Sequence, residues 1–348
     1  MQSSEVGGEY IMRLPAHKSI SKSIPQKAAD LFGIVSSELE QVRGLIKEQL
    51  VGSCRAGPVR RLVEGFDICG GKMLRPGLVL VCGRAVGELT DEHIRAAAVV
   101  EMIHNATLLH DDVIDEGQRR RGEPTANNLW GNETAVLLGD FLLSRACEMC
   151  AEMGGEVNKV MAAATARVCE GELRQVIERE NRELGESEYL EIISDKSGSL
   201  FGSSCYLGGF LAGCDESEAE LLRAFGLNVG IAFQIMDDLV DIIGEEGRVG
   251  KTLGSDVDKN KLTLAVIHLL RQLDDDKRAV VKEGSLGAGG GSKESLIKLL
   301  GSYGSVRYAK SRAQEFVNKA ILSLDGLRAS IAKEALIEAA RFVCERTI

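Results

Sequence analysis

The chain has 348 residues, of which 44% are hydrophobic and 27% charged, and its formal net charge is −10. This balance is typical of a globular protein, and the negative charge argues against generic binding to nucleic acid or to an anionic membrane. No apolar run reaches the roughly 18 residues of a membrane span. Nine cysteines scattered among apolar neighbours indicate buried, reduced thiols, so we expect a cytoplasmic protein.

Residues 1–26 are rich in Ser and carry both basic and acidic side chains, which predicts a poorly ordered arm before one domain over 27–348. Helical periodicity dominates that domain, and strand signals are scarce. Polar, Gly-rich stretches at 245–256 and 283–294 predict surface loops. We therefore expect an all-α protein with helices over 27–51, 57–67, 73–86, 91–115, 132–152, 156–180, 186–213, 215–243, 260–281, 293–300, 305–323 and 328–346.

A first cluster of carboxylates follows the apolar run near the end of the helix expected over 91–115. The segment LLHDDVIDEG contains Asp111, Asp112 and Asp115, which form a DDxxD motif. Like charges this close together repel one another unless cations hold them. Most of the other side chains on this helix are apolar, so we expect it to be buried with its carboxylates facing a cavity.

A second DDxxD motif lies in FQIMDDLVDII at 233–243. Gln234, Asp237, Asp238 and Asp241 fall at the i, i+3, i+4 and i+7 positions of one helix face, and every other residue from Ile231 to Ile243 is apolar. Buried carboxylates need paired cations. All-oxygen ligands suit Mg²⁺, which commonly bridges carboxylates to substrate phosphates.

Basic residues occur in short segments that could neutralise such phosphates. GGKMLRP (70–76) places Lys72 and Arg75 after a glycine pair, where free backbone N–H groups favour an anion. Further cations lie in RRRGEPT after the first motif, in KSGSLF at 196–201, and in GKTLGSDVDKNK after the second motif. As a set around two acidic stripes, these residues predict a site for two diphosphates.

The motifs together resemble the trans-isoprenyl diphosphate synthases, particularly polyprenyl diphosphate synthases of medium and long product length. The similarity runs from about residue 30 to the C-terminus. It rests on GGKxxRP at 70–76, HNATLLHDDVID at 104–115, RRGxPT at 120–125, GExxQ at 171–175, KSGxLF at 196–201, FQxxDDxxD at 233–241 and GKxxGxD at 250–256. Met73 stands where the family often has a basic residue.

The resemblance implies a bundle of ten or more helices around a central catalytic cavity, usually a homodimer, with about three Mg²⁺ per active site. It implies head-to-tail condensation of isopentenyl diphosphate with an allylic diphosphate, and a peripheral membrane contact could serve product release. The implied metal-binding residues are Asp111, Asp112, Asp115, Asp237, Asp238 and Asp241. The implied allylic diphosphate contacts are Arg120, Lys196, Ser197, Gln234, Lys251 and Lys261, of which Lys196 and Lys251 count as catalytic with Asp111, Asp112 and Asp237. The implied isopentenyl diphosphate contacts are Lys72, Arg75, His104 and Arg121.

Product length is expected to depend on the residues that precede the first motif. Ala106 and Thr107 lie one helical turn before Asp111, with Ile103 deeper on the same face. Short-chain relatives tend to place bulky aromatic residues there, so the small side chains of this sequence favour products of about five to ten isoprene units. A floor from another helix, such as the one that carries Phe141, would shorten this range.

Four other functions fit parts of the pattern. A short-chain farnesyl or geranylgeranyl diphosphate synthase would share every motif except the chain-length residues. A class I terpene cyclase would need neither GGKMLRP nor a second DDxxD. A His-Asp phosphohydrolase is suggested by His110 beside Asp111, but five histidines make a thin ligand set, and His110 is better explained by packing. A non-catalytic partner subunit would generally lack the aspartate motifs.

Overall fold

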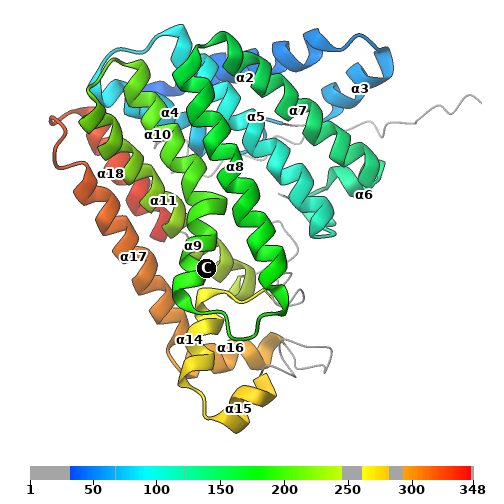
Figure 1. Cartoon of the computed structure of the whole chain (residues 1–348), viewed down its shortest axis with the longest axis vertical. Coiled ribbons are helices and arrows are strands. Elements are labelled where there is room, and N and C mark those ends of the chain that lie inside the picture. The colour runs from blue at the N-terminus through cyan, green and yellow to red at the C-terminus, as the bar shows by residue number, and fades with distance from the viewer. Residues whose placement is uncertain (1–31, 67, 121, 245–260, 282–292, 346–348) are drawn as a thin grey trace, which may run out of the picture.

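The computed structural model describes residues 32–66, 68–120, 122–244, 261–281 and 293–345. The predicted arm (1–26), the loop at 245–256 and most of the loop at 283–294 lie outside the described residues, as do Arg121 and Lys251. In the described part of the chain, the molecule is a bundle of helices with one two-stranded hairpin (Figure 1). The prediction of an all-α fold is confirmed. No helix of the described residues is long and apolar enough to cross a membrane.

The elements of the first half are η1 (Gly33–Val35), α2 (Ser36–Ser53), α3 (Gly57–Gly65), α4 (Leu74–Val86), α5 (Asp91–Ile114), β1 (Arg119–Arg120), β2 (Glu123–Pro124), α6 (Ala126–Trp130), α7 (Asn132–Glu152), α8 (Gly155–Ile177) and η2 (Glu178–Glu180). The second half contains α9 (Glu186–Ile193), η3 (Ser194–Gly198), α10 (Ser199–Leu211), α11 (Glu216–Ile243), α14 (Leu264–Gln272), α15 (Asp275–Val280), α16 (Lys293–Ser302), α17 (Ser305–Ser323) and α18 (Ile331–Cys344).

Two helices that carry the acidic motifs begin with well-formed caps. At the start of α5, Thr90 and His93 form a reciprocal capping box, and Asp91 and Glu92 lie in the first turn. At the start of α11, the side chain of Asp215 accepts a hydrogen bond from the backbone of Glu218 at 2.9 Å. Each motif lies at the opposite, C-terminal end of its helix, so the caps fix helices whose far ends reach the cavity.

The core is built around α10, which packs against α4, α5, α8 and α11. Its closest contact with α11 passes over Gly226, where an added Cβ would lie 2.4 Å from the carbonyl oxygen of Phe201. Only glycine permits this approach. In Figure 1, α8, α10 and α11 run along one another through the middle of the molecule, while α14, α15 and α16 form its lower end.

Three predicted elements differ from the structure. The helix expected over 186–213 is interrupted by the π-helical turn η3. The helix expected over 260–281 divides into α14 and α15, because Asp274 caps the second helix by accepting a hydrogen bond from the backbone of Lys277. The RRGEPT loop forms the short antiparallel hairpin β1–β2, with Arg120 opposite Glu123. All three differences arise from local turns that helical periodicity does not reveal.

Candidate active site

The first acidic motif occupies the last turn of α5. Asp111 and Asp112 lie inside the helix, and Asp115 is its C-cap residue. The C-terminal end of a helix carries a partial negative charge, so carboxylates there are repelled by the helix dipole as well as by one another. Cationic partners are therefore needed for each of them.

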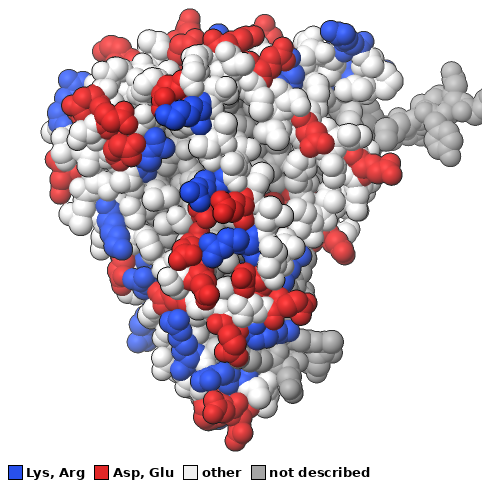
Figure 2. Space-filling view, in the orientation of Figure 1, with Lys and Arg blue, Asp and Glu red and all other residues white. Residues whose placement is uncertain are grey.

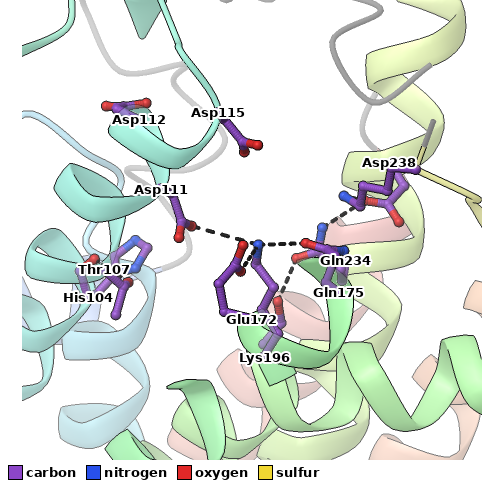
Figure 3. A network of polar contacts seen from close by, with 12 residues as sticks. His104, Thr107, Asp111, Asp112, Asp115, Glu172, Gln175, Lys196, Gln234 and Asp238 are labelled. Carbon is purple, nitrogen blue, oxygen red and sulfur yellow. Dashed lines mark hydrogen bonds and ion pairs between the residues drawn. The ribbon is translucent and has the colours of Figure 1, made fainter. Parts of the chain in front are cut away.

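Asp112 has a local partner. Its carboxylate accepts hydrogen bonds from Nε of Arg120 at 3.0 Å and from Nη2 at 2.8 Å, a fork that the β1–β2 hairpin returns to the helix end. The side chain of Asn127 donates to the backbone carbonyl of Asp112 at 3.2 Å. Asp112 is thus buried and paired, and its carboxylate lies apart from the central cluster of Figure 3.

Asp111 and Asp115 point toward the facing helices (Figure 3). Arg179 donates to Asp115 at 3.1 Å, and Nζ of Lys196 lies 3.8 Å from Oδ2 of Asp111. Burial raises the pKa of Asp111 to about 6; Lys196 opposes this shift, whereas the negative charge of Glu172 adds to it. The ionised form of Asp111 is therefore under-compensated by the protein's own cations.

The second motif lies in the last turns of α11 and is buried more deeply than the first. Asp238 and Asp241 are each 2% exposed. Asp238 accepts hydrogen bonds from Tyr189 at 2.7 Å, from Gln234 at 2.8 Å and from Lys261 at 3.2 Å. The predicted polar stripe is confirmed, because Gln234 and the aspartates face polar partners while the rest of the helix enters the core. Asp237 is half-buried on the same helix.

Lys196 lies between the two motifs (Figure 3). It belongs to the π-helical turn η3, and its ammonium contacts the carboxylate of Glu172 and donates to Oε1 of Gln175 at 2.8 Å. The neighbouring Ser197 donates to Oε1 of Gln234 on α11. Burial lowers the pKa of Lys196, but the carboxylates of Asp111 and Glu172 raise it overall, so the ammonium stays charged.

Charges on the two motifs act on the same cation. Burial lowers the pKa of Arg120, but its hydrogen bonds with Asp112 and the charges of Asp111 and Asp237 raise it overall. Asp237 belongs to the second motif and Arg120 to the hairpin that follows the first. The two acidic stripes therefore face a common space, as the sequence predicts.

The predicted isopentenyl diphosphate residues start at the beginning of α4. The guanidinium of Arg75 lies 4.3 Å from the ring centre of Phe201, and the ammonium of Lys72 lies 5.4 Å from that of Phe342 on α18. Between them, Met73 adopts a left-handed backbone (φ 50°) with its side chain 2% exposed. The position where the family often carries a basic residue therefore faces the apolar core in this chain.

The predicted chain-length residues lie on α5 behind Asp111. Ala106 and Ile103 are each 2% exposed, and Oγ1 of Thr107 donates to the carbonyl of His104 at 2.8 Å. His104 and Thr107 lie next to each other, one to two turns before the motif (Figure 3). An apolar pocket exists elsewhere, next to Phe201 and Phe342, and none of the chain-length residues lines it.

His110 packs as predicted. Its ring lies over Gly139 of α7, where an added Cβ would come 2.4 Å from Nε2. Nε2 also lies 3.2 Å from the carbonyl oxygen of Val136 and 3.3 Å from Oδ1 of Asp140. These contacts direct the ring away from the acidic motifs and remove the support for a His-Asp metal site.

The donor chemistry suits a hard divalent cation. Carboxylate oxygens from two helices face one space, and the raised pKa of Asp111 marks a negative charge that a cation would relieve. Within the described residues, no three His, Cys, Asp or Glu side chains are close enough together to enclose a metal ion by themselves. This fits Mg²⁺, which typically takes one or two carboxylates and completes its coordination with water and substrate phosphate.

Sequence reasoning did not identify several partners of the motifs. Tyr189 contacts Asp238, Arg179 contacts Asp115, and both Glu172 and Gln175 contact Lys196. The GExxQ motif was a signal for the last two residues, although it carried no assigned role. Tyr189 and Arg179 stand in ordinary helical sequence, and only the packing of α9 and η2 brings them to the site.

Comparisons with known proteins agree with this geometry. A family model described as polyprenyl synthetase matches residues 60–298. The octaprenyl diphosphate synthase of Escherichia coli is 34% identical over 92% of this chain and 96% of its own length, and the geranylgeranyl pyrophosphate synthase of Geoglobus acetivorans is 35% identical over 88% and 95%. The polyprenyl synthase of Caulobacter crescentus, solved with calcium and isoprenyl diphosphate, superposes with a TM-score of 0.86 at 32% identity, covering 92% of this chain and 98% of that one. The chain belongs to the polyprenyl synthetase family.

Proposed function

We propose that this protein is a trans-polyprenyl diphosphate synthase, a prenyltransferase that joins isopentenyl diphosphate head to tail to an allylic diphosphate. The observation that carries this proposal is the pair of buried acidic motifs facing each other across Lys196. A cavity with this much negative charge is suited to a polyanion only when divalent cations enter with it. Membership of the family supports the same activity.

The allylic diphosphate is assigned to the space between the motifs. Lys196, Gln234 and Arg120 surround that space, and Ser197 and Lys261 stand behind them through contacts with Gln234 and Asp238. Lys251 is assigned to the same site from the motif alone. Isopentenyl diphosphate is assigned to Lys72, Arg75 and His104, with Arg121 from its motif. Aromatic rings beneath Lys72 and Arg75 hold their cationic groups in place for a second anion.

The condensation begins with cleavage of the allylic C–O bond, whose electron pair leaves with the diphosphate. The double bond of isopentenyl diphosphate then attacks the allylic cation to form the new C–C bond, and the proton lost afterwards goes to the released diphosphate. Lys196 and Arg120 stabilise the negative charge that develops on the leaving group, and the apolar core excludes water from the cation. About three Mg²⁺, held by Asp111, Asp115 and Asp237 with the remaining motif carboxylates, would supply the main neutralising charge when bound.

The product is proposed to contain about five to ten isoprene units. Support comes from the small, buried side chain of Ala106 below Asp111, with Thr107 and Ile103 on the same helix. Relatives of this chain include an octaprenyl and a geranylgeranyl diphosphate synthase, so family membership alone leaves the length open. The substitution Ala106→Phe should shorten the product, while Ala163→Phe on the exposed face of α8 should leave it unchanged.

A homodimer in the cytoplasm, with a synthase domain over 27–348, completes the proposal. Exposed apolar side chains gather on α7 and α8: Val136, Leu137, Leu173, Val176 and Ile177. Figure 2 shows few charged side chains over α7 and the upper part of α8, whereas charges of both signs cover the lower part of this face. Exposed apolar surface of this kind favours association with a second copy.

One experiment tests the activity. The protein is incubated with Mg²⁺, labelled isopentenyl diphosphate and geranyl, farnesyl or geranylgeranyl diphosphate in turn, and the dephosphorylated products are separated by length. We expect elongation that stops at a narrow range of lengths and disappears when a chelator removes Mg²⁺. Absence of elongation with every primer would overturn the proposal, and a product formed without isopentenyl diphosphate would indicate a terpene cyclase instead.

A further inference from the structure

The GExxQ motif at 171–175 of α8 takes no part in the function proposed above. Its three defined positions all face the turn η3, which carries Lys196. An added Cβ on Gly171 would lie 2.5 Å from the backbone nitrogen of Lys196 and 2.9 Å from its Cα. The glycine therefore lets the backbone of α8 approach this turn closely enough for short side chains to reach the lysine.

The other two motif positions hold the lysine ammonium. Glu172 and Gln175 are three residues apart and so share a helix face. The carboxylate of Glu172 contacts Nζ of Lys196, and Oε1 of Gln175 accepts a hydrogen bond from it at 2.8 Å. The side chains of Glu172 and Lys196 are only 14% and 15% exposed, so the ion pair is largely shielded from water.

Asp111 competes for the same ammonium. Its Oδ2 lies 3.8 Å from Nζ of Lys196, which is an ion pair without a hydrogen bond. Lysine is a flexible point charge on a four-carbon stem, so loss of Glu172 would let its ammonium close onto Asp111. A direct Lys196–Asp111 contact would occupy both a cation meant for the diphosphate and a carboxylate meant for the metal (Figure 3).

We infer that Glu172 is a positioning residue that holds Lys196 between the acidic motifs and keeps its ammonium from closing onto Asp111. Gln175 fixes the direction of the ammonium, and Gly171 admits the helix that carries both. The inference rests on the proposed function, because it assumes that the space between Lys196 and Asp111 receives an allylic diphosphate. It assigns to Glu172 an effect on that substrate alone, transmitted through Lys196.

The test is a double-mutant cycle between Glu172 and Lys196. Binding of a farnesyl diphosphate analogue whose bridging oxygen is replaced by sulfur is measured by titration calorimetry in the presence of Mg²⁺. For Glu172→Ala we expect an affinity about tenfold lower, as for loss of a buried charged hydrogen bond. Glu172→Gln keeps an oxygen toward Lys196 and should recover part of this loss. In a Lys196→Met background, Glu172→Ala should change the affinity less than twofold.

Two controls separate positioning from folding. Glu170→Ala removes an exposed carboxylate that pairs with Arg167 on the same helix, and it should leave the affinity unchanged. Steady-state KM for isopentenyl diphosphate should stay within twofold in the Glu172 variants, whereas KM for the allylic primer should rise. If Glu172→Ala does not fold, Glu172→Gln carries the cycle.

The outcomes are distinct. Additive losses in the cycle, or an equal rise in both KM values, would overturn the positioning role while elongation by the unmodified protein upheld the proposed function. An unmodified protein that elongates no primer would overturn both. Loss of affinity in Glu172→Ala that vanishes in the Lys196→Met background supports the inference.

Discussion

The two acidic motifs have the same spacing and the same place at the end of a helix, yet the protein compensates their charge in different ways. The middle aspartate of the first motif, Asp112, pairs with Arg120 from a hairpin only eight residues away. The middle aspartate of the second, Asp238, is held by Tyr189 and Lys261, which are 49 and 23 residues away along the chain, together with Gln234 on its own helix. The first motif is completed locally, and the second depends on tertiary packing.

This difference has an energetic consequence. The side chain of Arg120 is 37% exposed, so water can replace Asp112 as its partner. The side chains around Asp238 have less access to water, since Lys261 is 16% exposed and Asp238 is 2% exposed. A buried cation that loses its carboxylate is costly, whereas an exposed cation is not. The second motif should therefore contribute more to stability than the first.

The largest expected effect compares Asp238→Ala with Asp112→Ala. Because Asp238→Ala strands a buried lysine and a buried hydroxyl, it should lower the free energy of unfolding by about 3 to 5 kcal/mol. Asp112→Ala should lower it by about 1 to 2 kcal/mol, since Arg120 can turn to water. Urea unfolding without metal measures both. The control Asp275→Ala alters a carboxylate that is 96% exposed and should have almost no effect. Equal losses at the two motifs would contradict the comparison.

A second prediction concerns Asp111→Asn in metal-free protein. The folded pKa of Asp111 is about 6, above the value near 4 of an unfolded chain, so its ionisation destabilises the fold. Wild-type stability attributable to this group is present below about pH 4 and is lost as the pH rises to about 6. The variant should therefore be more stable than wild type by on the order of 2 kcal/mol at pH 8, and nearly equal to it at pH 4.

The same substitution should nearly abolish activity, by roughly a hundredfold or more, because a metal ligand supplies several kcal/mol of transition-state stabilisation. Unfolding curves at several pH values with a chelator, together with elongation assays at pH 8, test both halves. A variant that loses activity without gaining stability would show that the charge of Asp111 is already balanced in the empty site.

The smallest effect is expected for Tyr189→Phe. This change removes one hydrogen bond to Asp238 and leaves those from Lys261 and Gln234, so it should cost about 1 kcal/mol in stability. Activity should fall only a few-fold, because Asp238 keeps its position. Urea unfolding and steady-state kinetics measure the two effects. A loss as large as that of Asp238→Ala would mean that the hydroxyl, rather than the lysine, determines the conformation of the motif.

The fold class and the family were predictable, and both predictions are confirmed. An otherwise apolar helix with a stripe of Gln234, Asp237, Asp238 and Asp241 has few alternatives to facing a polar cavity. The pairing of Lys196 with Glu172 was not predictable, because it depends on the π-helical turn η3 and on how closely α8 crosses it. Tyr189 escaped notice for the same reason: its role exists only when α9 packs beside α11.

The hairpin β1–β2 also determines the order in which the site can assemble. As soon as Pro124 has left the ribosome, the chain holds everything needed to join Arg120 to Asp112. The second motif must wait for Lys261 and for the return of α11 against α9. A nascent chain would thus display one finished acidic stripe long before the other, and a protease or chaperone acting on unfinished chains would meet the second stripe in its unpaired state.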